Sequence, residues 1–181
     1  NGMSPSRRNN KFANSGIVVE INADKDLHKY EQFGALKALE FQKDFEKLAF
    51  TSGNRDQTAP AQRMTDFVEG RLSSTLNETS YQPGIKSAPL HSLFPKIIGS
   101  ALRKGFKAFG DKMKGYYTEE ANIVGVESRT SSPVNIPRKD NLEHIEIEGL
   151  FPCGEGGGYA GGIVSAAMDG ERCAEAAAVG L

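Results

Sequence analysis

The sequence has 181 residues, 38% hydrophobic and 25% charged, which is the composition of one ordinary globular domain. Its formal net charge of -1 gives no overall basic field, and no apolar run reaches membrane length. We therefore expect neither a nucleic-acid partner nor a membrane partner. We expect the protein in the cytoplasm. The two cysteines, Cys153 and Cys173, form no CxxC motif and no disulfide framework. The three histidines show no paired spacing, so no metal site is expected.

The first half of the sequence mixes one strand with several helices. Residues 1–15 are polar, and the β-branched run at 17–21 predicts a short buried strand. Apolar residues at helical spacing predict a helix over 31–50, ended by Gly53, and a short helix over 63–72. Residues 52–62 and 73–89 are predicted to be loops. The clearest helix covers 92–113, with Ser92 as N-cap and Pro95 in its first turn.

The second half predicts short strands followed by one helix. Strands are expected over 122–129, 134–137 and 150–153, with weak alternation at 144–147 and an alanine-rich helix over 162–179. Because the order lacks regular βαβ alternation, the predicted class is α+β.

A glycine-rich junction lies between the last predicted strand and the last helix. Six of the nine residues from Gly154 to Gly162 are glycine. Such density lets the backbone approach a ligand without Cβ clashes, and the following helix would present free N–H groups and a positive dipole end. The alternative is a tight strand–helix connection with no ligand. We interpret the junction as a cofactor contact, because ordinary turns need fewer glycines.

The identity of the cofactor depends on the residues after the junction. Residues 156–161 match GxGxxG, but a dinucleotide fingerprint needs a second strand and an acidic residue about 20 positions further on. The sequence stops at Leu181 with no second strand, so we do not expect a pyrophosphate site, and no Walker-A lysine is present. The remaining interpretation is the second cofactor motif of flavoproteins. In that motif a carboxylate binds the ribityl chain, and a helix N-terminus faces the flavin ring.

Several blocks carry a resemblance to a known family. The segment from Gly149 through Gly154-Glu155-Gly156 to Gly170 is similar to the C-terminal signature of the uncharacterised FAD-dependent dehydrogenases, within the NAD(P)/FAD-dependent oxidoreductases. Further similar blocks, in chain order, are Asn1-Gly2-Met3-Ser4, residues 13–19, residues 59–63 with Asp66-Phe67, residues 80–84 and residues 127–134.

The resemblance implies an FAD cofactor, with NAD(P)H as a possible electron donor, and a small-molecule substrate. Residues 1–16 would return from the FAD domain, 17–138 would form an inserted substrate-side domain, and 139–181 would complete the FAD-binding domain with a strand, glycine-rich loop and helix. Glu155 would bind the ribityl chain. The predicted cofactor contacts are Gly154, Glu155, Gly156, Gly158, Tyr159, Gly161, Gly162 and Ile163.

One guanidinium and three hydroxyls are adjacent in the sequence, in Arg129, Thr130, Ser131 and Ser132. We predict that these four residues contact an anionic part of the substrate. The alternative is an ordinary turn with local hydrogen bonds. Where the family pattern leads us to expect arginine after Ser-Pro-Val, this sequence has Asn135, which leaves the substrate class open. Tyr159 is interpreted either as a flavin neighbour or as a cover for the last helix, and Cys153 either as a redox thiol or as a packing residue.

The family's N-terminal FAD-binding βαβ unit, with its own GxGxxG, is absent from these residues. We therefore expect these 181 residues alone to bind FAD weakly or not at all. Two other functions stay open: a flavin- or nucleotide-binding module without catalysis, and an interaction domain whose glycines are structural.

Overall fold

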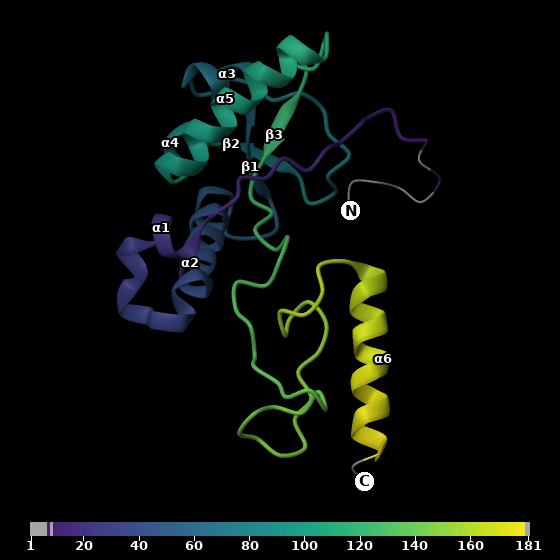
Figure 1. Ribbon diagram of the computed structural model, residues 1–181. Coiled ribbons are helices and arrows are strands. Elements are labelled where there is room, and N and C mark those ends of the chain that lie inside the picture. The colour runs from purple at the N-terminus through teal and green to yellow at the C-terminus, as the bar shows by residue number, and fades with distance from the viewer. Residues whose placement is uncertain (1–6, 8, 180–181) are drawn as a thin grey trace. The chain divides into compact units, whose positions relative to one another are not determined.

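The structure is a computed structural model that describes residue 7 and residues 9–179, so the similar block at residues 1–4 lies outside it. The described chain forms two compact units (Figure 1). Unit 1 takes the described residues up to Asp26 together with Asp44–Val126. Unit 2 takes Leu27–Lys43 and the described residues from Glu127 onward. The three-segment division expected from the sequence stays a prediction.

Unit 1 is built on a three-stranded sheet in the order β2-β1-β3. The central strand β1 (Ala59–Arg63) pairs in parallel with β2 (Ile85–Ser87) and antiparallel with β3 (Asn122–Val124). Ala61 of β1 faces Ser87 on one side and Val124 on the other. The middle of β1 is buried, which is the usual position of a strand paired on both edges.

Helices of unit 1 supply the apolar core beside this sheet (Figure 1). They are α3 (Met64–Glu69), α4 (Leu90–Leu93), α5 (Lys96–Lys112) and the second part of α2 (Lys37–Ser52), and α1 (Ala23–Asp26) precedes them in the chain. Phe67 of α3 is fully buried. Its ring meets Phe94 at 5.9 Å and Phe106 of α5 at 6.0 Å between centroids, in edge-on geometry that aromatic pairs prefer.

Unit 2 contains little sheet and one long helix. It starts with the 3-10 segment His28–Leu36, broken at Gly34, and the first part of α2. An irregular stretch from Glu127 to Gly162 then leads into α6 (Ile163–Val179), drawn in yellow in Figure 1. Asp169 and Cys173, four positions apart, are the buried residues of α6. They therefore lie on the same face of the helix.

The helices were largely predictable, and the class is α+β as expected. The helices predicted over 63–72 and 162–179 are confirmed as α3 and α6, and the one over 31–50 is confirmed from Lys37 onward. Gly53 directly follows α2, as predicted. The strand expected over 122–129 is present but ends at Val124.

Three predicted strands are wrong. Residues 17–21, 134–137 and 150–153 are irregular, and the alternation near 144–147 yields a single bridge between Arg138 and His144. A segment with strand propensity becomes a strand only when another strand satisfies its backbone groups. The described residues provide no such partner for these three segments. The segment before the glycine-rich loop is therefore not a strand in this structure.

The long helix predicted over 92–113 is wrong at its start. It begins at Lys96, with Pro95 as N-cap rather than in the first turn, and Ser92 belongs to the separate helix α4. Phe94 is extended because a residue before proline is pushed away from helical angles. In addition, β1 and β2 occupy segments that were predicted as loops. Both strands are short, and the proline, glycine and serine residues around them are typical of loops.

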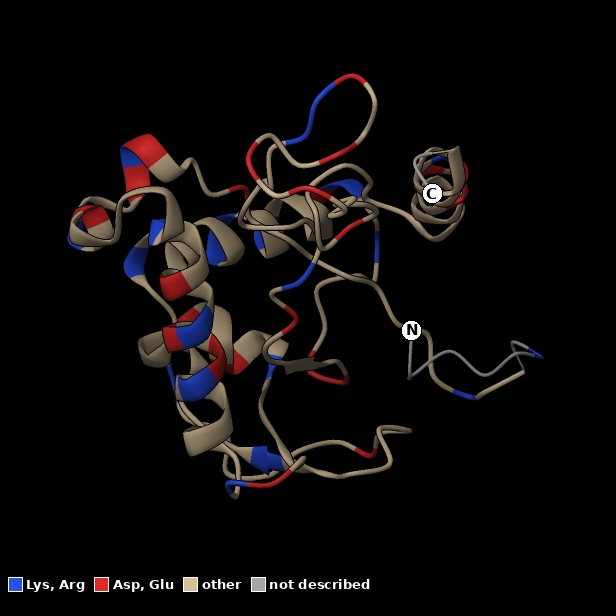
Figure 2. Ribbon diagram, turned by 90° about the horizontal axis from the view of Figure 1, so that it is seen from below, with Lys and Arg blue, Asp and Glu red and all other residues tan. Residues whose placement is uncertain are grey.

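Charge is spread over the described residues, with Lys and Arg interspersed among Asp and Glu (Figure 2). No helix in the described part of the chain combines the length and the apolar character needed to span a bilayer.

Candidate functional site

The glycine-rich loop folds into a tight turn that needs glycine at particular positions. The N–H of Tyr159 donates to the carbonyl of Gly154 at 3.0 Å, and the N–H of Gly158 donates to that of Glu155 at 3.0 Å. Gly158 has φ 84°, and a Cβ there would lie 2.7 Å from the Val134 carbonyl oxygen. A side chain at this position would therefore strain the turn and displace the neighbouring segment.

Other glycines of the loop have no such internal reason. A Cβ built on Gly156 or Gly161 meets no atom of the described chain within 4 Å, and both residues are exposed. At Gly162 the nearest atom is the Ser165 hydroxyl oxygen, at 3.5 Å. The fold of this chain thus leaves open space at Gly156 and Gly161, and only an ordinary contact at Gly162, so a ligand can approach the backbone closely there.

The N-terminus of α6 opens onto the same space. Ile163 is 85% exposed and Val164 72% exposed. The Ser165 hydroxyl accepts a hydrogen bond from the N–H of Gly162 at 3.2 Å. The first N–H groups of a helix have no acceptor within the helix, and the dipole adds partial positive charge there. The start of α6 thus offers hydrogen-bond donors, and Glu155 near the other end of the loop has an exposed carboxylate that can accept.

A buried ion pair anchors the loop to α6. The guanidinium of Arg138 donates to both carboxylate oxygens of Asp169, at 2.7 and 3.0 Å, and to the Pro152 carbonyl at 2.8 Å. Each of the two charged side chains is only 11% exposed. The N–H of Gly154 donates to Asp169 at 2.9 Å, so one carboxylate holds both the arginine and the start of the loop.

The two charges of this pair alter each other's protonation. The hydrogen bonds from Arg138, and then the one from the N–H of Gly154, hold the pKa of Asp169 below its usual value. The Asp169 carboxylate likewise raises the pKa of Arg138. Both shifts favour the charged forms of the pair at neutral pH.

Tyr159 packs against this anchor. The Arg138 guanidinium carbon lies 3.6 Å from the centre of the Tyr159 ring, within the range of a cation–π contact. The Tyr159 hydroxyl donates to the Ile136 carbonyl at 2.8 Å. One face of the ring is therefore occupied by the arginine.

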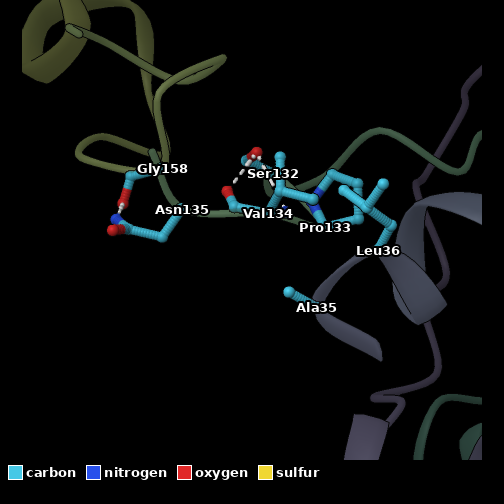
Figure 3. A pocket seen from close by; sticks show the side chains of 7 residues that line it. All are labelled: Ala35, Leu36, Ser132, Pro133, Val134, Asn135 and Gly158. Atoms are coloured by element: carbon cyan, nitrogen blue, oxygen red, sulfur yellow. Dashed lines mark hydrogen bonds between the residues drawn. The ribbon is translucent and has the colours of Figure 1, made fainter. Parts of the chain in front are cut away.

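Part of the predicted substrate segment meets the glycine-rich loop at an open pocket of about 430 Å³ (Figure 3). Ser132 and Gly158 both line it, and the Asn135 amide donates to the Gly158 carbonyl at 3.3 Å. The Ser132 hydroxyl donates to the Val134 carbonyl at 2.7 Å. The lining residues are Ala35, Leu36, Ser132, Pro133, Val134, Asn135 and Gly158.

The remaining residues of the predicted substrate segment are not brought into this pocket. Arg129, Thr130 and Ser131 are exposed and do not line it. The structure thus brings one predicted substrate residue, Ser132, next to one predicted cofactor residue, Gly158.

Sequence reasoning missed the anchor pair. A signal was present, because Asp169 is a lone carboxylate on the helix face that also carries Ala166 and Cys173, where apolar residues are normal. Such a residue predicts a buried cationic partner. The sequence did not identify that partner, since Arg138 lies 31 residues away.

Comparison with known proteins identifies the group to which this chain is related. A family model described as "FAD-dependent protein, C-terminal domain-like" matches residues 1–130. The chain belongs to this family of FAD-dependent proteins. It is also 41% identical over 177 residues to a Clostridium beijerinckii protein whose name is "Uncharacterized protein". That alignment covers 97% of this chain but only 32% of the relative, so the chain spans about one third of the relative's length.

The family match covers only a minor part of the candidate site. The family match ends at residue 130, before the pocket residues from Ser132 onward and before the glycine-rich loop. The match to an FAD-dependent family thus rests on residues 1–130, and the geometry of the loop is an independent observation.

Proposed function

We propose that this chain is the C-terminal portion of a longer FAD-dependent oxidoreductase, and that the segment from Gly154 to Ile163 contacts the flavin. The observation that carries the proposal is the density of glycine from Gly154 to Gly162, including Gly156 and Gly161, where the chain's own fold does not require glycine. Membership of an FAD-dependent family supports the choice of cofactor.

The residues of the loop fit FAD in their chemistry. The exposed carboxylate of Glu155 is an acceptor suited to a ribityl hydroxyl, and Gly161 and Gly162 allow close approach of the backbone. The N–H groups at the start of α6, near Ile163, would stabilise negative charge on a polar ring edge. Gly154, Gly158 and Tyr159 hold the turn in shape, and Gly156 borders the open space.

When bound, FAD supplies hydride transfer, and the protein provides binding, orientation and electrostatics. We propose that Arg129, Thr130, Ser131 and Ser132 lie on the substrate side. The pocket beside Gly158 supports this for Ser132. Asn135 also lines that pocket, and it carries no positive charge for an anionic substrate group.

The test uses the whole protein, purified from cells and examined by absorbance spectroscopy. We expect a flavin spectrum with about one FAD per chain, bleached under anaerobic conditions by a reduced nicotinamide or an organic donor. Whole protein that carries no FAD, and takes none up when the cofactor is added, would overturn the proposal. Bound flavin that no donor reduces would overturn the oxidoreductase part and favour a binding module.

A further inference from the structure

Two cysteines that are 20 positions apart in the sequence lie near each other where the segment before the glycine-rich loop packs against α6. Cys153, the residue before the loop, is exposed, and Cys173 is buried on α6 with 3% of its surface accessible. The Cys173 sulfur lies 3.8 Å from the carbonyl oxygen of Pro152. That carbonyl belongs to the peptide bond joining Pro152 to Cys153, so the Cys153 Cα is one peptide plane away.

The surroundings give the two thiols different properties. Burial raises the pKa of the Cys173 thiol, and the adjacent Cys153 side chain contributes to the same shift. The Arg138 guanidinium, whose Nη1 lies 3.3 Å from the Cys173 sulfur, opposes it by favouring the thiolate. Cys173 is therefore shielded from solvent oxidants, while Cys153 is accessible to them.

We propose that Cys153 and Cys173 form a reversible disulfide when the protein meets a hydroperoxide, making this junction a redox modification site. The exposed Cys153 sulfur attacks the peroxide O–O bond and becomes a sulfenic acid, while the other oxygen leaves as water or an alcohol. The Cys173 sulfur then attacks the Cys153 sulfur, and the hydroxyl leaves as water. With hydrogen peroxide, two thiols and one peroxide thus give one disulfide and two waters.

The cross-link would act on the loop that we propose to contact flavin, and its effect on the cofactor rests on that proposed function. A disulfide needs Cα atoms about 4.4–6.8 Å apart, which is compatible with a Cys173 sulfur that contacts the carbonyl one peptide bond before Cys153 and whose pKa responds to the Cys153 side chain. It would bind the start of the loop to α6 covalently, beside the hydrogen bond from the N–H of Gly154 to Asp169. Formation of the bond does not require FAD, so it can be tested separately from the proposed function.

The experiment treats the folded whole protein, first reduced and freed of reductant, with a small excess of hydrogen peroxide. Remaining thiols are blocked with N-ethylmaleimide, and the protein is cleaved with trypsin. Trypsin cuts after Arg172, so Cys153 lies in the peptide of residues 140–172 and Cys173 lies in the peptide that follows. We expect the two peptides joined, with two hydrogens lost from their summed mass and release by dithiothreitol. Finding both cysteines singly blocked, or Cys153 as sulfinic acid with Cys173 blocked, would overturn the proposal.

A variant separates the two chemical steps. In Cys173→Ala, which keeps a small apolar side chain in the buried site, peroxide should leave Cys153 as a sulfenic acid that dimedone traps. The wild-type protein should give little dimedone adduct, because Cys173 consumes the intermediate. Equal adduct in both proteins, with circular dichroism showing both folded, would contradict a resolving role for Cys173.

Discussion

At the scale of single residues, Arg138 and Asp169 determine how the candidate site is held. The carboxylate of Asp169 accepts hydrogen bonds from the arginine and from the N–H of Gly154, and the arginine also binds the Pro152 carbonyl. Loop and helix are thus joined through two side chains. Losing either one leaves a buried charge without its partner.

Replacement of Asp169 by alanine should therefore loosen the loop and α6 together. We expect a loss of about 3 kcal/mol, at the lower end of the cost of removing one partner of a buried pair, because the pair lies near the surface of a small unit. Hydrogen exchange of the α6 amides measures the change. Glu175→Ala, an exposed position on the same helix, serves as the control and should change stability by less than about 0.5 kcal/mol. Equal effects of the two variants would contradict the anchoring role.

The same pair predicts a pH dependence. The folded pKa of Asp169 is depressed, so its contribution to stability is present above the unfolded pKa of about 4 and is lost as pH falls through the folded value. Asp169→Asn removes this contribution. The stability difference between wild type and Asp169→Asn should therefore be full at pH ~7 and shrink below pH ~4. We would measure it by α6 hydrogen exchange corrected for intrinsic rates. A difference that stays constant into acid would show that the charge of Asp169 is unimportant.

The sequence reveals single residues only where a local rule applies. Glycine density pointed to the loop, and the structure places Ser132 and Gly158 beside one pocket, while their roles toward substrate and cofactor stay predictions. The Arg138–Asp169 pair was not predicted, because sequence patterns report contacts within a helix turn and not across a separation of 31 residues.

At the scale of elements, periodicity predicted the helices better than the strands. Helices α5 and α6 satisfy their own backbone hydrogen bonds, so a local pattern is enough to reveal them. Strands need a partner. The run at 17–21 has strong strand propensity and no partner among the described residues, while β1 has weak propensity but is paired on both edges. Strand pairing therefore decided that β1 is a strand and that residues 17–21 are not, and the sequence alone does not show which segments pair.

The core of unit 1 provides a test at this scale. Phe67 of α3 is fully buried between the rings of Phe94 and Phe106. Phe67→Ala should cost about 4 kcal/mol, because it removes a large apolar side chain and leaves a cavity. Hydrogen exchange of the α5 amides provides the readout. The matched control is Leu72→Ala at a side chain that is 59% exposed, which should cost under about 0.5 kcal/mol. A small effect of Phe67→Ala would contradict the packing of α3 against α5.

At the scale of the whole molecule, the chain aligns with 32% of the length of its Clostridium beijerinckii relative. The exposed N-terminus of α6 and the open glycines belong to unit 2. The family match lies largely in unit 1, through residue 130. We propose that the whole protein completes the FAD site, with this chain contributing the flavin side of it.

The central claim is that the glycine-rich loop contacts flavin, and the most direct measurement is the FAD content of whole protein carrying Gly161→Val. A Cβ at this position meets no atom of the described chain, so the substitution should leave the fold intact. Gly16→Val, at an equally open position outside the loop, is the matched control. We predict at least a tenfold loss of FAD affinity for Gly161→Val, unchanged circular dichroism for both variants, and normal occupancy for Gly16→Val. Full FAD occupancy in folded Gly161→Val would contradict the account.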